Sequence, residues 1–168
     1  MIIRAEEGKI IIELNEHEKE LSINEDEVTL ANRALNRFVN LGLDANRLVL
    51  KQNTTSYATI SYRGNSFDWD LIRFKYTNRA TWVSVSVSSN ERKEYEHSPI
   101  FAAQKNKRQA MWKAQIESIE DVDRLTDIAF RYIKEIMEKF PENFYRFNCL
   151  ARNSQGNFQT CFNASQAF

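Results

Sequence analysis

Two long stretches of the chain repeat apolar residues at the spacing of an amphipathic α-helix. In residues 25–41 the apolar positions fall on one face, and they are Val28, Ala31, Leu35, Phe38 and Val39. Asn24 followed by Glu27 is typical of an N-terminal capping box, and Gly42 is typical of the left-handed residue that ends a helix. The pattern predicts a helix over 25–41.

The second stretch, residues 119–140, also has a continuous apolar face. Its members are Ile119, Val122, Leu125, Ile128, Ala129, Tyr132, Ile133, Ile136, Met137 and Phe140. Ser118 with Asp121 resembles a second capping box, and Pro141 ends the helix. The opposite face carries three charge pairs at i, i+4, which are Glu120 with Arg124, Asp127 with Arg131, and Glu135 with Lys139. We therefore expect this opposite face to be solvated.

Between the two helices the chain alternates with the period of a β-strand. The strand-like stretches are residues 47–52, 57–63, 69–76, 81–88 and 111–116. The short breaks at Gly64-Asn65 and Thr77-Asn78 predict antiparallel neighbours. Residues 89–110, which include Pro99, are expected to form an irregular excursion with a short helical turn.

The two ends of the chain also contain strand signals. Residues 9–14 predict a strand, with 21–23 as its hairpin partner, and residues 144–150 and 158–162 predict a terminal hairpin around Gly156. We expect a single α+β domain over 1–168, in which two helices cover one face of a mostly antiparallel sheet of five or more strands. Its core would lie at about 9–140, with 142–168 as a terminal hairpin or appendage.

Composition narrows the class of protein. Hydrophobic residues make up 42% of the 168, which excludes a wholly disordered chain. No stretch approaches the roughly 20 apolar residues of a membrane span, and the N-terminus has neither a basic leader nor an apolar export segment. These features predict a soluble, cytoplasmic protein that does not bind membranes.

Cys149 and Cys161 are too few for a disulfide scaffold, so we expect free thiols. The terminal hairpin would place them nearly opposite each other, and a bridge would form only in an exported or oxidised chain. Neither lies in a zinc-binding spacing.

The net charge is zero, but the charges are unevenly distributed. Residues 1–27 carry a net −6, 28–116 a net +8, 117–142 a net −4 and 143–168 a net +2. One interpretation is that acids gather at the two helix starts, where the macrodipole favours them. The other is a basic face in the middle of the chain that binds an anionic partner.

Alternation assigns sides to three of the predicted strands, because residues two apart share a face. The inward set is Ile72, Phe74, Tyr76, Val83, Val85, Val87, Trp112, Ala114 and Ile116. The outward set is Leu71, Arg73, Lys75, Trp82, Ser84, Ser86, Lys113 and Gln115. Three further bases, Lys105, Lys107 and Arg108, lie on the adjoining loop.

An open sheet face with bases, hydroxyls and one large aromatic ring suits single-stranded nucleic acid. A base can stack on the ring while lysine and arginine contact the phosphates. The candidate binding residues are Arg73, Lys75, Trp82, Lys105, Lys107, Arg108 and Lys113. The alternative is an ordinary polar sheet surface, with Trp82 covered by the excursion.

The competing class is an enzyme, but the sequence contains few features that indicate catalysis. Asp68 and Asp70 precede Lys75 on one strand, as in a nuclease core, but Arg73 occupies the position where a nuclease needs an acid. The chain has no phosphate-binding glycine loop, no zinc-protease motif and no hydrolase serine motif. We therefore predict no catalytic residue, no cofactor and no metal site.

One resemblance extends over residues 48–140. It is based on DLIRFKY at 70–76, TWVSV at 81–85, FAAQKNK at 101–107, Trp112-Lys113 and SIED at 118–121. These stretches resemble an uncharacterised bacterial domain that occurs alone or joined to exonuclease-like and other DNA-handling proteins. The resemblance implies an association with nucleic-acid processing and implies no catalytic residue.

The sequence thus favours a non-enzymatic binding or accessory module whose partner is nucleic acid or a nucleic-acid-processing protein. A degenerate nuclease that uses Asp68 and Asp70 is one alternative. A protein-interaction or oligomerisation module is another, with Trp82 and the Ile100-Phe101 loop as aromatic anchors.

Overall fold

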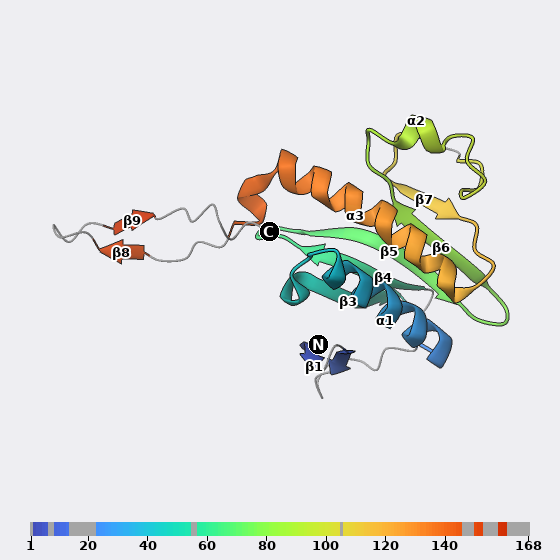
Figure 1. Ribbon diagram of the computed structural model, residues 1–168, viewed down its shortest axis with the longest axis horizontal. Coiled ribbons are helices and arrows are strands. Elements are labelled where there is room, and N and C mark those ends of the chain that lie inside the picture. The colour runs from blue at the N-terminus through green and yellow to red at the C-terminus, as the bar shows by residue number, and fades with distance from the viewer. Residues whose placement is uncertain are drawn as a thin grey trace.

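A computed structural model describes residues 23–54, 57–104 and 106–145, together with the backbone of four short strands at 2–6, 9–13, 150–152 and 158–160. At its centre is a five-stranded antiparallel sheet in which strands that are consecutive in the chain lie side by side (Figure 1). The strands are β3 (Leu48–Thr54), β4 (Tyr57–Arg63), β5 (Asp68–Tyr76), β6 (Thr81–Ser86) and β7 (Met111–Ala114). Two long helices, α1 (Glu25–Asn40) and α3 (Val122–Lys139), cover one face of this sheet. The predicted α+β class is confirmed.

Both ends of α1 form as the sequence predicts. The Asn24 side chain accepts a hydrogen bond from the Glu27 main-chain N–H (2.8 Å), and Glu27 accepts one in return from the Asn24 N–H (3.2 Å). At the other end Gly42 has a φ of 107°, and the Leu43 N–H donates to the Phe38 carbonyl. Val28, however, is exposed, because the buried stripe is centred near Phe38, which lies about a quarter turn around the helix from Val28.

The second helix starts with the 3-10 turn η2 (Ile119–Asp121), where the Ser118 N–H donates to the Asp121 carboxylate (3.1 Å). From there α3 buries Leu125, Ala129 and Ile133 against the sheet, as predicted. Phe140 is 44% exposed, because the helix ends at Lys139 and the next residues form the 3-10 turn η3 (Pro141–Asn143).

Ion pairs on α3 differ from the predicted pattern. Arg37 forms a two-bonded fork with Asp127 (2.6 Å), and Arg33 forms another with Asp123 (2.8 Å), so these two acids of α3 pair with α1. The predicted pair of Glu135 with Lys139 along α3 is confirmed. Arg131 pairs instead with Glu91 (2.6 Å), and Arg124 with Asp121 (3.4 Å). The predictions of Asp127 with Arg131 and Glu120 with Arg124 were therefore wrong. A planar guanidinium gains two parallel bonds from a facing carboxylate, which i, i+4 neighbours on one helix seldom offer.

The excursion between β6 and β7 is irregular, as predicted, apart from the short helix α2 (Arg92–Tyr95). Phe101 is buried, with its ring edge-on to Trp112 (5.5 Å between centroids) and to Tyr95 (5.3 Å). The Ala102 N–H donates to the Lys113 carbonyl, so this segment runs along the free edge of β7. Phe101 is therefore a core residue, and it is not available as the aromatic anchor that the protein-interaction alternative requires.

The chain ends contain two further antiparallel pairs. β2 (Lys9–Glu13) pairs with β1 (Ile2–Glu6), whereas the sequence predicted 21–23 as its partner. Only two residues separate β1 from β2, so closing this hairpin costs less chain entropy than closing one over 15–20. β8 (Leu150–Arg152) pairs with β9 (Phe158–Thr160), which confirms a terminal hairpin. Its first strand begins at the residue where the predicted strand 144–150 ends, so the prediction of that strand was wrong in position.

Phe144 does not belong to that hairpin. It follows η3 and is buried, with its ring 5.0 Å from Trp69 and 5.9 Å from Tyr62. Aromatic burial of this size outweighs the weak strand preference of an isolated residue. Cys149 and Cys161 lie outside the described residues.

Candidate functional site

The face of the sheet opposite the helices is formed by polar residues of β4 and β5. On β4 Ala58 and Ile60 are buried beneath the helices, so Tyr57, Thr59 and Ser61 face the other way. We call this side the open face. Sequence alternation in 57–63 already contains this information, although the prediction had assigned faces to the later strands only.

A β-bulge interrupts the pairing of β4 with β5. Ile60 pairs with Ile72 and the next residue, Ser61, pairs with Asp70, which leaves Leu71 as the extra residue. Leu71 is 0% exposed, so its predicted outward position was wrong. The bulge breaks the two-residue alternation at that point and places Asp70 on the open face.

One row of residues crosses the open face in register. Lys51 of β3 pairs with Thr59, Thr59 with Arg73, Arg73 with Ser84, and Ser84 with Lys113 of β7. Directly paired residues share a face, and adjacent strands lie about 4.8 Å apart, so the row spans roughly 19 Å. Three basic residues, Lys51 on β3, Arg73 on β5 and Lys113 on β7, therefore span the width of the sheet.

An aromatic pair lies beside this row. The rings of Tyr57 and Trp82 are 5.6 Å apart at 59°, and the Arg73 guanidinium lies 5.9 Å from the Tyr57 ring centre. Trp82 is partly buried, with its ring against Tyr57. The geometry is that of a tilted aromatic pair with a cation above one ring.

Asp70 is the centre of a dense polar cluster on this face. Its Oδ1 accepts from the Ser61 hydroxyl (2.7 Å), and its Oδ2 accepts from Arg73 Nη2 (2.7 Å) and Nε (3.2 Å). The Lys51 ammonium lies 3.5 Å from Oδ1. Burial acts to raise the pKa of Asp70, but the hydrogen bonds from Ser61 and Arg73 and the charge of Lys51 outweigh it, so the pKa is lowered.

Asp68 has similar partners, because Lys51 lies 3.5 Å from one oxygen and Arg63 lies 3.6 Å from the other. Both aspartates of the nuclease alternative are therefore matched by bases. Within the described residues no three His, Cys, Asp or Glu side chains come together as metal ligands.

Lys75 is directed to the edge of the open face. It pairs in register with Trp82, and its ammonium lies 3.8 Å from the Glu27 carboxylate at the start of α1. Glu27 is 1% exposed and also accepts the Tyr76 main-chain N–H (2.9 Å). Lys75 is thus partly committed to a buried acid and is less available to a ligand than the sequence predicted.

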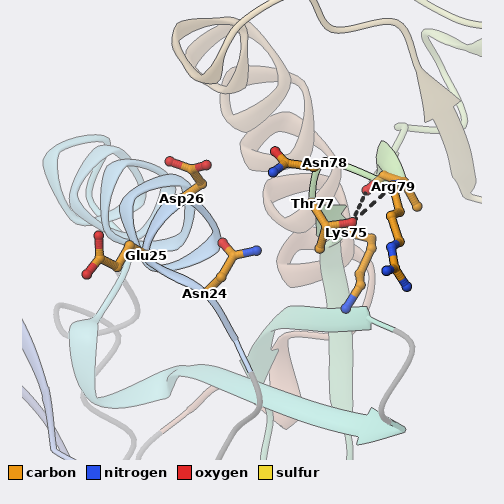
Figure 2. A pocket seen from close by; sticks show the side chains of 8 residues that line it. Asn24, Glu25, Asp26, Lys75, Thr77, Asn78 and Arg79 are labelled. Carbon is orange, nitrogen blue, oxygen red and sulfur yellow. Dashed lines mark hydrogen bonds between the residues drawn. The ribbon is translucent and has the colours of Figure 1, made fainter.

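A pocket of about 740 Å³ lies beside Lys75, between the start of α1 and the turn that joins β5 to β6 (Figure 2). Glu25 and Asp26 lie on its helix side, while Lys75 and Arg79 lie on its strand side. Thr77 is bonded to Ala80 in the turn. Acids and bases on opposing walls give this pocket no net preference for an anion.

The remaining predicted bases lie on the excursion. Lys107 pairs with Glu96 (3.1 Å), and the exposed Arg108 accepts from the Arg92 guanidinium through its main-chain oxygen (2.8 Å). Lys105 lies outside the described residues. The structure therefore places Arg73 and Lys113 in one row, with Lys75 and Trp82 beside it, while Lys107 is paired within the excursion.

A second polar cluster lies at the helix-covered side. Glu135 accepts from the hydroxyls of Ser88 and Ser89, from the Ser89 main-chain N–H (2.9 Å) and from Lys139. Its side chain is almost fully buried, so the prediction of a solvated face was wrong at this residue. Burial acts to raise its pKa, but the bonds from Lys139, Ser88 and Ser89 prevail and lower it to about 2.

This pKa predicts a specific dependence of stability on pH. The unfolded chain has the ordinary value near 4.5, so the stabilisation by Glu135 is complete above that pH and is lost as pH falls toward about 2. In urea titrations the difference in unfolding free energy between wild type and Glu135→Gln should shrink steadily from pH 5 to pH 2.5. Glu138 is exposed on the same helix, so Glu138→Gln is the control. If the unfolding free energies of both variants depended on pH in the same way, the lowered pKa of Glu135 would be contradicted.

Comparison with known proteins gives no match: no family model, no curated protein and no solved structure is similar to the chain. The resemblance to a domain of DNA-handling proteins therefore stays a prediction. No helix in the described part of the chain is long and apolar enough to cross a membrane.

Proposed function

We propose that the protein is a non-enzymatic module that binds single-stranded nucleic acid on the open face of its sheet. The observation that carries this proposal is the half-buried Trp82, which packs against Tyr57 directly beside the row of Lys51, Arg73 and Lys113. The Trp82 indole is a ring on which a nucleobase of any identity can stack, and the lysine and arginine side chains beside it favour the phosphates.

Charge on this face supports the same class of ligand. The described part of the open face carries more bases than acids; the bases are Lys51, Arg63, Arg73, Lys75 and Lys113, against Asp68 and Asp70. Lys113 is exposed at one end of the row. This excess of basic side chains beside an aromatic pair favours a single strand over a duplex, because the nucleobases of a duplex are not available for stacking.

The test is a titration of a fluorescein-labelled twelve-residue oligo-dT, read by anisotropy at ~50 mM salt, where counterion release favours association. We expect micromolar affinity that falls steeply as salt rises. Trp82→Ala should weaken binding by about 1 to 3 kcal/mol through lost stacking, while Trp82→Phe retains part of it. Lys113→Ala should weaken binding and reduce the salt slope by about 0.7, the value for one phosphate contact on a single strand.

Lys134→Ala is the matched control, because it removes the same charge from α3 on the helix-covered side. Lys113 is preferred to Lys75 as the test residue, since Lys75 also pairs with the buried Glu27. Absence of binding at ~50 mM salt, or binding that salt does not change, would overturn the proposal.

A further inference from the structure

The cluster around Asp70 has the donor set of a phosphate site. It combines a hydroxyl from Ser61, a two-bonded guanidinium from Arg73 and an ammonium from Lys51, all directed at one carboxylate. These three donor types, converging from neighbouring strands, are those that proteins use to bind a phosphodiester oxygen. In the free protein the anion at their centre is the side chain of Asp70 itself.

Thr59 gives an independent sign of a missing acceptor. Thr59 is 0% exposed, and its side-chain Oγ1 has no hydrogen-bond partner within the described residues. Thr59 pairs directly with Lys51 on one side and with Arg73 on the other. A buried hydroxyl without a partner is unfavourable, and this one lies between the two bases where a bound anion would be nearest.

The charged members of the cluster are accessible enough to exchange one anion for another, whereas Thr59 and Ser61 are 0% exposed in the free protein. The side chains of Arg73, Lys51 and Asp70 are 38%, 30% and 23% exposed. An ion pair in such surroundings is weak, so a phosphate of a strand already bound on the open face can compete for the guanidinium.

We propose that Lys51, Thr59, Ser61 and Arg73 form a phosphodiester site, and that the Asp70 carboxylate occupies it until a strand of nucleic acid displaces it. This inference rests on the proposed function, because the displacing phosphate belongs to the strand bound beside Trp82. Asp70 thereby lowers the affinity of the free protein, since binding must first release the internal ion pair.

The test compares Asp70→Asn with Asp68→Asn in the oligo-dT titration. Both variants remove one acid from β5. Only Asp70→Asn removes the carboxylate that binds the Arg73 guanidinium, and the asparagine oxygen can still accept a hydrogen bond from Ser61. We expect Asp70→Asn to bind about two- to fivefold more tightly than Asp68→Asn, the worth of one partly exposed ion pair. Its salt slope should be steeper by about 0.7, which corresponds to one added phosphate contact.

Thr59→Val provides a second measurement that does not depend on charge. The hydroxyl has no partner among the described residues, so an isosteric methyl should leave the unfolding free energy unchanged or raised. Oligo-dT binding by the Asp70→Asn variant should weaken when Thr59→Val is added. Stability lowered by Thr59→Val without loss of binding would overturn the role of this hydroxyl.

Two further arms distinguish the source of the phosphate. An oligo-dT with uncharged methylphosphonate linkages should lose the advantage of Asp70→Asn, and inorganic phosphate should compete only at millimolar concentration. Preferential binding of inorganic phosphate would assign the site to a free anion and overturn the inference. If wild type binds DNA but Asp70→Asn equals Asp68→Asn, the inference fails while the proposed function stands; if neither wild type nor Asp70→Asn binds, both fail.

Discussion

Truncation of Leu125 or Ile133 to alanine is expected to destabilise the protein by about 2 to 5 kcal/mol, a large part of the roughly 5 to 15 kcal/mol that separates a folded domain from its unfolded state. Both side chains are 0% exposed on the face of α3 that packs against the sheet. Removing them deletes buried apolar contacts and leaves cavities that rigid strands cannot fill.

Lys113→Ala is the matched comparison, because this residue is exposed on the open face of β7. Its substitution should change the unfolding free energy by less than about 0.5 kcal/mol. Urea titrations of the three variants, with slopes compared to that of wild type, measure the difference. Similar destabilisation by Lys113→Ala and Leu125→Ala would mean that the two faces of the sheet are assigned in reverse, and the proposed nucleic-acid surface would fail with them.

The elements of this fold follow closely from the sequence, because each depends on a local pattern. The five sheet strands are found within two residues of their predicted bounds at every end. The capping box at Asn24 and Glu27 and the left-handed Gly42 have local geometric causes, and both form. Val28 and Phe140 were predicted on the buried faces but are exposed. Apolar periodicity does not determine the width of the buried stripe or the last turn of a helix.

The candidate site was only partly predictable, because its partners come from different strands. Alternation predicts that Arg73 and Trp82 share one face, and the register of the sheet supports this. The cluster around Asp70 depends on a bulge, which shifts the pairing by one residue and has no signature in the local sequence. The same limit explains Glu135, whose partners Ser88 and Ser89 lie almost 50 residues earlier in the chain.

Charge patterning was the least reliable guide, because it counts bases without their partners. Residues 28–116 have a net charge of +8, which suggested a strongly basic face. In the structure Arg73 is paired with Asp70, Lys75 with Glu27 and Lys107 with Glu96, so the field at the open face is weaker than the sequence total implies. The affinity expected of this surface is therefore moderate, and it depends on Trp82 and Lys113 more than on the net charge of the segment.

Replacement of Glu27 by alanine is expected to cost about 2 to 5 kcal/mol, although the residue is charged and lies at a helix start. Its buried carboxylate accepts the N–H groups of Asn24 and Tyr76 and faces the Lys75 ammonium, so it joins the first turn of α1 to the end of β5. Alanine would leave these donors without their acceptor at a position where the native side chain is 1% exposed.

Two variants separate this role from a general charge effect. Glu25→Ala removes an exposed acid from the same first turn and should cost less than about 1 kcal/mol, the size of a helix-dipole interaction. Glu27→Gln retains a side-chain oxygen for the Tyr76 N–H and should fall between the two alanine variants. Equal unfolding free energies for Glu25→Ala and Glu27→Ala in urea titrations would show that the capping position contributes only through charge, and that the link between α1 and β5 does not stabilise the fold.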